Sequence, residues 1–164
     1  MPKVSDAKKR DAEATKKRIL TSAKKAFAKK GLGGARVDEI AENASANKRM
    51  IYHYFGNKEA LFLRTLEDAY LDIRLAEQKL ELDTLPPKDA LDKLVCFTWN
   101  YYIANPEFIT LVNSENLHKA RHLKQSKIIS EINQKFVSMV GKLLDRGVSD
   151  GVFRDDIDPV QLNI

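Results

Sequence analysis

Apolar residues recur every three or four positions along most of the chain, and no stretch alternates apolar and polar residues as a half-buried strand does. This period predicts helices over about residues 12–30, 37–44, 48–55, 58–79, 88–104, 108–123 and 127–146. The strongest internal break is DTLPP at residues 83–87, where two prolines end the helical pattern. The pattern therefore predicts an all-α fold.

Two of the predicted helices are short and closely spaced. The apolar residues of 37–44 fall on one helical face. Ser45 and Ala46 are small enough for a tight turn, and Asn47 is a favoured N-cap for the helix that follows. Two short helices joined in this way indicate a helix-turn-helix.

The helix 48–55 has two unlike faces. Ile51 and Phe55 are four positions apart and can face a core, which leaves cations, a phenol and an imidazole facing outward. Such a helix suits the major groove, where Arg and Lys bind guanine edges and Tyr contacts phosphates. Asn57 is a cap for the next helix, whose positive N-terminus attracts a phosphate. The predicted DNA face consists of Lys48, Arg49, Tyr52, His53 and Lys58. Arg36 and Tyr54 are predicted to flank this face on phosphates.

The charge distribution favours a polyanionic partner for the N-terminal part. Residues 1–58 contain 15 Lys and Arg against 6 Asp and Glu, whereas residues 59–164 contain 13 against 17. Residues 1–11 show no apolar period and are predicted to be a mobile arm. Its basic residues Lys8, Lys9 and Arg10 could enter a minor groove or follow phosphates, as basic arms do, although a plain disordered tail is the preferred interpretation.

Three motifs in this segment, in order, are Val37-x-x-Ile40-Ala41, Tyr52-x-Tyr54-Phe55 and Lys58-Glu59-x-Leu61. Over about residues 15–61 the chain resembles the DNA-binding domain of the tetracycline-repressor (TetR) family. The turn departs from the Ala-Gly-Val-Ser common in that family, so we expect an ordinary residue to adopt the positive φ that the glycine would take. Arg36 replaces a common Thr. The resemblance implies a homodimer that places two recognition helices in a palindromic operator of double-stranded DNA.

The resemblance also implies a C-terminal helical bundle that binds a small-molecule effector. It divides the chain into a helix-turn-helix domain, 1–60, and an effector-binding and dimerisation domain, 61–164, joined by the helix that begins at Lys58. Between helices 88–104 and 127–146 it places a pocket, with candidate residues Trp99, Tyr102, Phe108, Asn113, His118 and Phe136. The aromatic residues fit a plain bundle core as well.

A metal site is the other chemistry to weigh. His118 and His122 have the spacing of zinc-binding helices, and Glu115 is nearby, but nothing in sequence completes four ligands. Surface or hydrogen-bonded histidines are the preferred interpretation, so no metal and no cofactor is predicted. A helical enzyme is a weak alternative, because no phosphate loop, nucleophile elbow or catalytic cysteine signature is present.

The remaining features concern location and completeness. No stretch approaches the roughly 20 apolar residues of a membrane span, and the lone Cys96 suits a reducing compartment, so a cytoplasmic regulator without a membrane partner is expected. A constitutive DNA-binding protein without an effector is the main alternative. Asp158-Pro159 looks like the start of a helix, in the place where the family builds its dimer helices. We therefore expect a truncated chain, with apolar surface exposed around Phe136, Val140, Leu143 and Val152.

Overall fold

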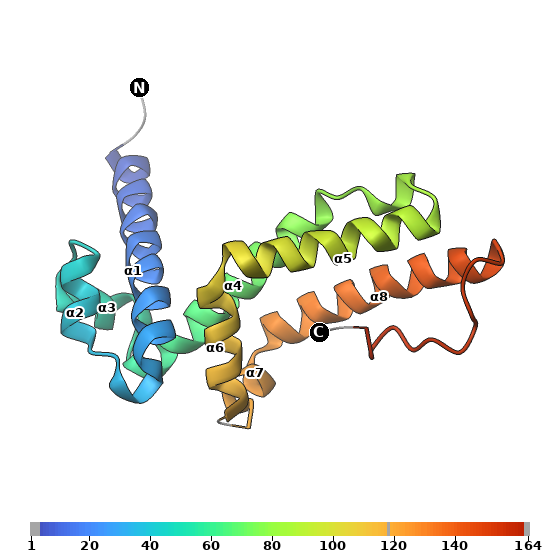
Figure 1. Cartoon of the computed structure of the whole chain (residues 1–164). Helices are drawn as coiled ribbons and strands as arrows, with labels where there is room; N and C mark the ends of the chain where they lie inside the picture. Colours follow the sequence, from blue (N-terminus) through green and yellow to red (C-terminus); the bar gives the residue numbers. More distant parts are fainter. Residues whose placement is uncertain (1–3, 118, 163–164) are drawn as a thin grey trace. The chain divides into compact units, whose positions relative to one another are not determined.

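The computed structural model describes residues 4–117 and 119–162, with side chains from residue 9 onward, and in these ranges it contains helices and turns but no strand (Figure 1). The all-α prediction is confirmed. The elements are α1 (Val4–Gly34), α2 (Val37–Asn43), α3 (Lys48–Phe55), α4 (Lys58–Gln78), a 3-10 turn η1 (Leu82–Thr84), α5 (Pro87–Ala104), α6 (Pro106–Leu117), α7 (Arg121–Gln125) and α8 (Lys127–Ser149).

The chain forms two compact units. The first contains residues up to 69 together with 106–123, and the second contains 70–105 together with 124 onward. The first half of α4 therefore belongs to the first unit and its second half to the second. The helix α6, which we had expected among the C-terminal helices, packs on α1. It does so because it buries Phe108 and Leu111 within the first unit.

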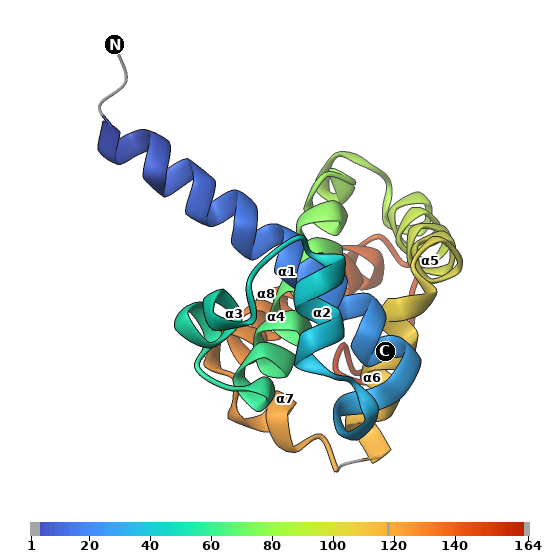
Figure 2. The same cartoon turned by 90° about the vertical axis from the view of Figure 1, so that its left-hand side faces the viewer.

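The helix α1 begins at Val4, eight residues before the predicted start at residue 12. The expectation of an arm without regular structure is therefore wrong for residues 4–11. Alanine, lysine and arginine, which favour helices, are frequent in this segment, and a Glu13–Lys16 ion pair of 2.9 Å supports the following turn. In Figure 2 the N-terminal turns of α1 extend well past α2 and α3. At the other end Gly31 has φ of 65°, the left-handed conformation that glycine often adopts where a helix ends.

The core of the first unit lies between α1, α2, α3, α4 and α6. Phe27 and Phe62 meet edge to face, with ring centroids 5.0 Å apart. Ile40 and Ile51 are, like Phe27, fully buried. Burying each such side chain contributes about 1.5–3 kcal/mol relative to leaving it in water. This core holds α3 with its polar face outward.

A polar pair is also buried in the first unit. Glu115 of α6 is fully buried, and its carboxylate accepts hydrogen bonds from the backbone N–H groups of His122 and Leu123. Nδ1 of His122 lies 2.9 Å from the other carboxylate oxygen. The imidazole then meets the edge of Phe62, with centroids 5.2 Å apart. The pair ties α6 and the start of α7 to α4.

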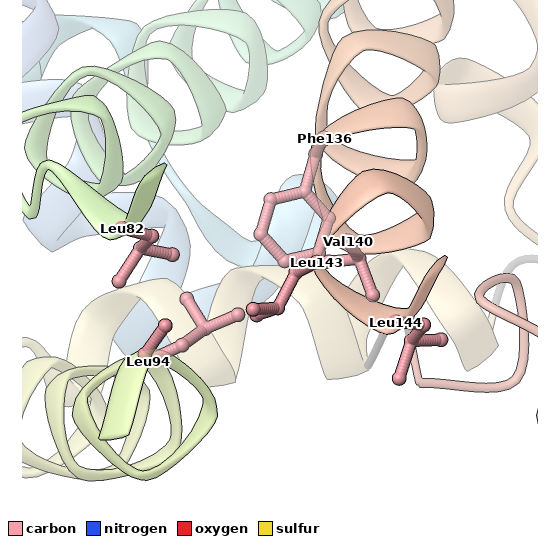
Figure 3. Close-up of a cluster of buried hydrophobic side chains, with 7 residues drawn as sticks. Leu82, Leu94, Phe136, Val140, Leu143 and Leu144 are labelled. Carbon is pink, nitrogen blue, oxygen red and sulfur yellow. The ribbon is translucent and has the colours of Figure 1, made fainter. Parts of the chain in front are cut away.

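The second unit has its own apolar core between η1, α5 and α8. Figure 3 shows side chains of α8 pointing toward Leu82 and Leu94, and the cluster comprises Leu82, Ala90, Leu94, Phe136, Val140, Leu143 and Leu144. The expected exposure around Phe136, Val140 and Leu143 is therefore wrong, because η1 and α5 cover them. Val152 is exposed, as expected.

The segment after α8 turns back onto that helix. A Cβ on Gly147 would lie 1.9 Å from the ring of Phe153, so only glycine allows this ring to lie against α8. Farther on, Asp158 Oδ1 accepts the Val160 N–H at 2.8 Å, as a helix cap would. The residues described up to 162 nevertheless form turns and not the predicted helix.

Candidate nucleic-acid interface

The helix α3 is fixed by its cap and its buried face. Asn47 Oδ1 accepts the Arg49 N–H at 2.8 Å, which confirms the predicted N-cap. Ser45 has φ of 49°, so the glycine-free turn does place an ordinary residue in the left-handed region. With Ile51 fully buried, four side chains that we predicted to face DNA are exposed: Lys48, Arg49, Tyr52 and His53.

Arg36 and Tyr54, predicted to flank the DNA face, differ in their exposure to solvent. Arg36 is exposed at the N-cap position of α2 and makes no side-chain capping bond. Tyr54 is half-buried, because Lys16 of α1 lies 5.4 Å from its ring centroid. This contact holds the C-terminal end of α3 against α1. The pairing of Lys16 with Tyr54 could not be seen in the sequence, since the two residues lie on different helices.

Lys58 begins α4 beside the same face. Asn57 Oδ1 accepts the Ala60 N–H at 2.8 Å, so the predicted cap of this helix is confirmed. The Lys58 ammonium donates to the Gly33 carbonyl oxygen at 3.1 Å. That contact keeps the cation at the positive end of the helix, where a phosphate is favoured.

Asp38 is a component of this face that sequence reasoning missed. Its carboxylate lies 2.7 Å from the ammonium of Lys48, and both side chains are about half exposed. The hydrogen bond from Lys48 lowers the pKa of Asp38, and the same contact raises the pKa of Lys48. In the sequence Asp38 is an ordinary acid in the first turn of a helix. Only the way in which α2 and α3 cross shows that Asp38 forms an ion pair with Lys48.

We expect Asp38→Ala to make Lys48 available to a phosphate. Operator affinity should rise at low salt, and the slope of log K against log [salt] should become steeper by about one. Fluorescence anisotropy on a labelled duplex between low and physiological salt measures both effects. Glu42→Ala removes an exposed acid from the same helix and serves as the control. An unchanged slope in Asp38→Ala would show that Lys48 does not contact phosphate.

The helix α1 adds a basic groove on the same unit. A cavity of about 820 Å³ lies along α1 and the end of α2, and its cations are Lys17, Arg18, Lys25, Lys29 and Lys30. Its one lining carboxylate, that of Glu39, is paired with Lys30 at 2.5 Å. The basic surface of the first unit therefore extends well beyond α3. Such a surface favours a polyanion.

Comparison with known proteins agrees with this geometry. The family described as "Bacterial regulatory proteins, tetR family" matches residues 19–65, and "Tetracyclin repressor-like, C-terminal domain" matches residues 87–164. The HTH-type transcriptional repressor NicS of Pseudomonas putida is 42% identical over 146 residues, which are 89% of this chain and 69% of that repressor. The chain belongs to the TetR family.

Other relatives of this TetR-family protein are also named as transcriptional regulators. The HTH-type transcriptional repressor SCO4008 of Streptomyces coelicolor is 40% identical over 66% of this chain and 53% of its own length. The crystal structure of transcriptional regulator SCO4942 from the same species superposes with a TM-score of 0.67 at 28% identity, covering 90% of this chain and 73% of that one. The protein is thus a helix-turn-helix DNA-binding regulator and not an enzyme. None of its described helices is long and apolar enough to cross a membrane.

The residues predicted to line an effector pocket fall into two groups. Phe108 and Asn113 belong to the first unit, where Phe108 is buried in the core and Asn113 is exposed. Trp99, Tyr102 and Phe136 belong to the second unit. Trp99 is 66% exposed, so it lies on the surface and not in the core. His118 lies outside the described residues.

Within the second unit a buried ion pair, Arg74–Glu77, lies beside Phe136, one of the aromatic residues predicted to line the pocket. Arg74 of α4 donates through Nη1 to both carboxylate oxygens of Glu77 at 2.8 Å, and its guanidinium lies 3.8 Å from the ring centroid of Phe136. Burial, together with the nearby Asp72 and Glu77 carboxylates, raises the pKa of Tyr101 to about 12. Burial likewise raises the pKa of Tyr102, and the charge of Arg74 opposes that rise. Sequence reasoning missed Arg74 and Glu77, although charged residues in an apolar stripe were a visible signal.

His122, a candidate metal ligand in the sequence, has a structural role instead. His122 is hydrogen-bonded to Glu115 in the core of the first unit, as the preferred interpretation predicted for the histidines of this segment. Across the described parts of the chain, no three His, Cys, Asp or Glu side chains come together as a metal site would need. Glu115 is instead a structural acceptor for the start of α7.

Proposed function

We propose that this TetR-family protein is a repressor that binds a palindromic operator as a homodimer and leaves it when a small molecule binds the C-terminal helices. The observation that carries the DNA-binding part is the fixed outward face of α3, with Lys48, Arg49, Tyr52 and His53 exposed together. The names of its relatives NicS and SCO4008 support repression. Two recognition helices of a dimer would enter major grooves about 34 Å apart, or a multiple of that distance.

The residues have separate roles in this proposal. Arg49, exposed near the N-terminus of α3, is suited to a bidentate contact with a guanine edge. Lys58, at the start of α4, is suited to a phosphate and so to binding that does not depend on sequence. Arg36 and Tyr54 flank the face and would contact phosphates on either side. Small-molecule release is favoured over constitutive binding because the second unit contains a cavity of about 300 Å³, close to the lower limit for ligand sites.

Two substitutions test the DNA-binding assignment. Arg49→Ala should cost about 1–3 kcal/mol on the preferred operator and relax the base preference at one position. Lys58→Ala should weaken binding to all sequences and lower the salt slope by about one. The operator is first selected from a random duplex library, and affinities are then measured by anisotropy over a salt series.

Lys88→Ala provides the control, because Lys88 is an exposed cation of α5 in the second unit. It should leave affinity, base preference and salt slope unchanged. If Arg49→Ala and Lys58→Ala behave like this control, α3 and the start of α4 do not form the DNA face.

Sedimentation of the protein with and without a duplex carrying both half-sites tests the dimer.

A further inference from the structure

We propose that the effector is a small organic anion that binds between α4 and α8 of the second unit, with its charge beside Lys135 and its apolar part against Phe136. This proposal rests on the proposed function, since it names the ligand class and the site of the effector response. It also replaces the pocket expected from the sequence, because Trp99, Tyr102, Phe108 and Asn113 do not line this cavity.

The cavity combines an apolar wall with a few charged groups. Its volume is about 300 Å³. Its apolar lining consists of Leu71, Leu75, Ile132, Phe136 and Met139. Its polar lining consists of Arg74, Glu77, Gln78 and Lys135. Small-molecule sites typically have this composition, in which a largely apolar surface binds the body of the ligand and a few polar groups orient it.

The deepest charged groups of the cavity are already arranged before any ligand arrives. Arg74 is 8% exposed and Glu77 is 2% exposed, and they form a 2.8 Å ion pair. Arg74 also lies over Phe136, and its Nη2 is 3.4 Å from Asn133 Oδ1 on α8. These contacts hold the guanidinium and the Phe136 ring in one arrangement. Pre-ordered groups of this kind lower the entropy lost when a ligand binds.

The charge balance of the lining selects the ligand class. Arg74 and Glu77 neutralise each other, so the remaining charge is that of Lys135. Lys135 is exposed on α8 and forms no ion pair with any described residue, including Glu131 one turn earlier. The Lys135 ammonium would repel a cationic ligand and would gain no ion pair from a neutral one. A carboxylate with an apolar body matches both the charge and the wall.

Binding at this place reaches the helix that leads to the DNA face. Leu71, Arg74 and Leu75 lie on the second half of α4, whose first residue is Lys58. A ligand that contacts both α4 and α8 favours whichever position of α4 improves those contacts. It changes operator affinity only by the difference between its affinities for the two positions.

Matched probes test the ligand class on the 164-residue chain. Hexanoate and benzoate are compared with hexanamide, benzamide and hexylamine, which keep the apolar body and change the charge. Isothermal titration reports binding. We expect the carboxylates to bind at least about tenfold more tightly than the amides, a difference of about 1.4 kcal/mol. Hexylamine should bind more weakly than hexanamide.

Variants test the site. Lys135→Gln should weaken carboxylate binding about tenfold and leave amide binding unchanged. Lys127→Gln, an exposed position at the start of the same helix, is the matched control and should change neither. Phe136→Leu should weaken both probe classes together. Equal affinities for carboxylates and amides, or a Lys135→Gln variant that binds carboxylates like the wild-type chain, overturn the proposal.

Operator affinity is measured both without a probe and with a carboxylate present, so the proposed function and the anion site can fail separately. A chain that binds its operator but shows no preference for carboxylates contradicts the anion site and leaves DNA recognition intact. A chain that binds carboxylates through Lys135, while its operator affinity stays the same, supports the site and contradicts release by the effector.

Discussion

Glu115→Ala is expected to destabilise the first unit by about 3–5 kcal/mol, because it breaks a buried pair and leaves the other partner in place. The fully buried carboxylate accepts from two backbone N–H groups and lies 2.9 Å from Nδ1 of His122. Alanine removes all three acceptor contacts at once. Desolvated donors without acceptors cost about 1–3 kcal/mol each, and the imidazole would remain wedged against Phe62.

Urea unfolding followed by circular dichroism measures the loss, and amide hydrogen exchange in α1 and α6 assigns it to the first unit. Glu115→Gln keeps one acceptor oxygen and should fall between the wild-type and the alanine variant. Asn116→Ala, the exposed neighbour on α6, should stay within about 0.5 kcal/mol of the wild-type. Because the same unit carries α3, operator binding by Glu115→Ala should decline at temperatures that the wild-type tolerates. A Glu115→Ala chain as stable as Asn116→Ala would show that the pair contributes nothing.

The sequence predicted well those features that depend on neighbours along the chain. The cap by Asn47 and the outward face of α3 follow from local chemistry and helical period. The cap by Asn57 and the break before α5 follow from the same rules. Local composition also explains the error at the start of α1, because helix propensity continues this helix through a segment without any apolar period.

Contacts between distant segments were the part that the sequence could not predict. Asp38 reaches Lys48 only because α2 and α3 cross at a particular angle. Phe108 was expected near Phe136, but α6 buries it in the first unit instead. An aromatic residue at helical spacing shows that a helix has a buried face, yet it does not show which partner covers that face. The expected effector pocket therefore combined residues from two units.

The burial of the Arg74–Glu77 pair is a second feature that the sequence could not predict. The two residues are three positions apart in α4, a spacing common to exposed surface pairs. Only the packing of α4 against α8, which places the Arg74 guanidinium over the Phe136 ring, reveals that this pair is buried and lines a cavity. Charged residues within an apolar stripe of a long helix are therefore a signal worth testing when a ligand site is sought.

Glu77→Leu is expected to cost about 3–5 kcal/mol of stability in the second unit, because Arg74 keeps its charge in the interior without that carboxylate. The double variant Arg74→Met/Glu77→Leu should recover most of this loss, since Met can fill the space beside Phe136 and no buried charge remains. Urea unfolding of the two single variants and the double variant gives the coupling energy of the pair. Additive losses would show that the two side chains do not act as a pair.

The pH dependence of the Glu77→Gln variant supplies an independent measure of the same pair. Burial raises the pKa of Glu77 above its ordinary value of 4.5, and the hydrogen bond and charge of Arg74 only partly oppose this. The folded state therefore binds more protons than the unfolded state just above pH 4.5. The contribution of Glu77 to stability is complete below that pH and declines as the pH rises through the folded-state pKa. The free energy of unfolding of the wild-type minus that of Glu77→Gln should accordingly fall over this window, whereas a difference that rises with pH would mean that Arg74 dominates and that the pKa is lowered.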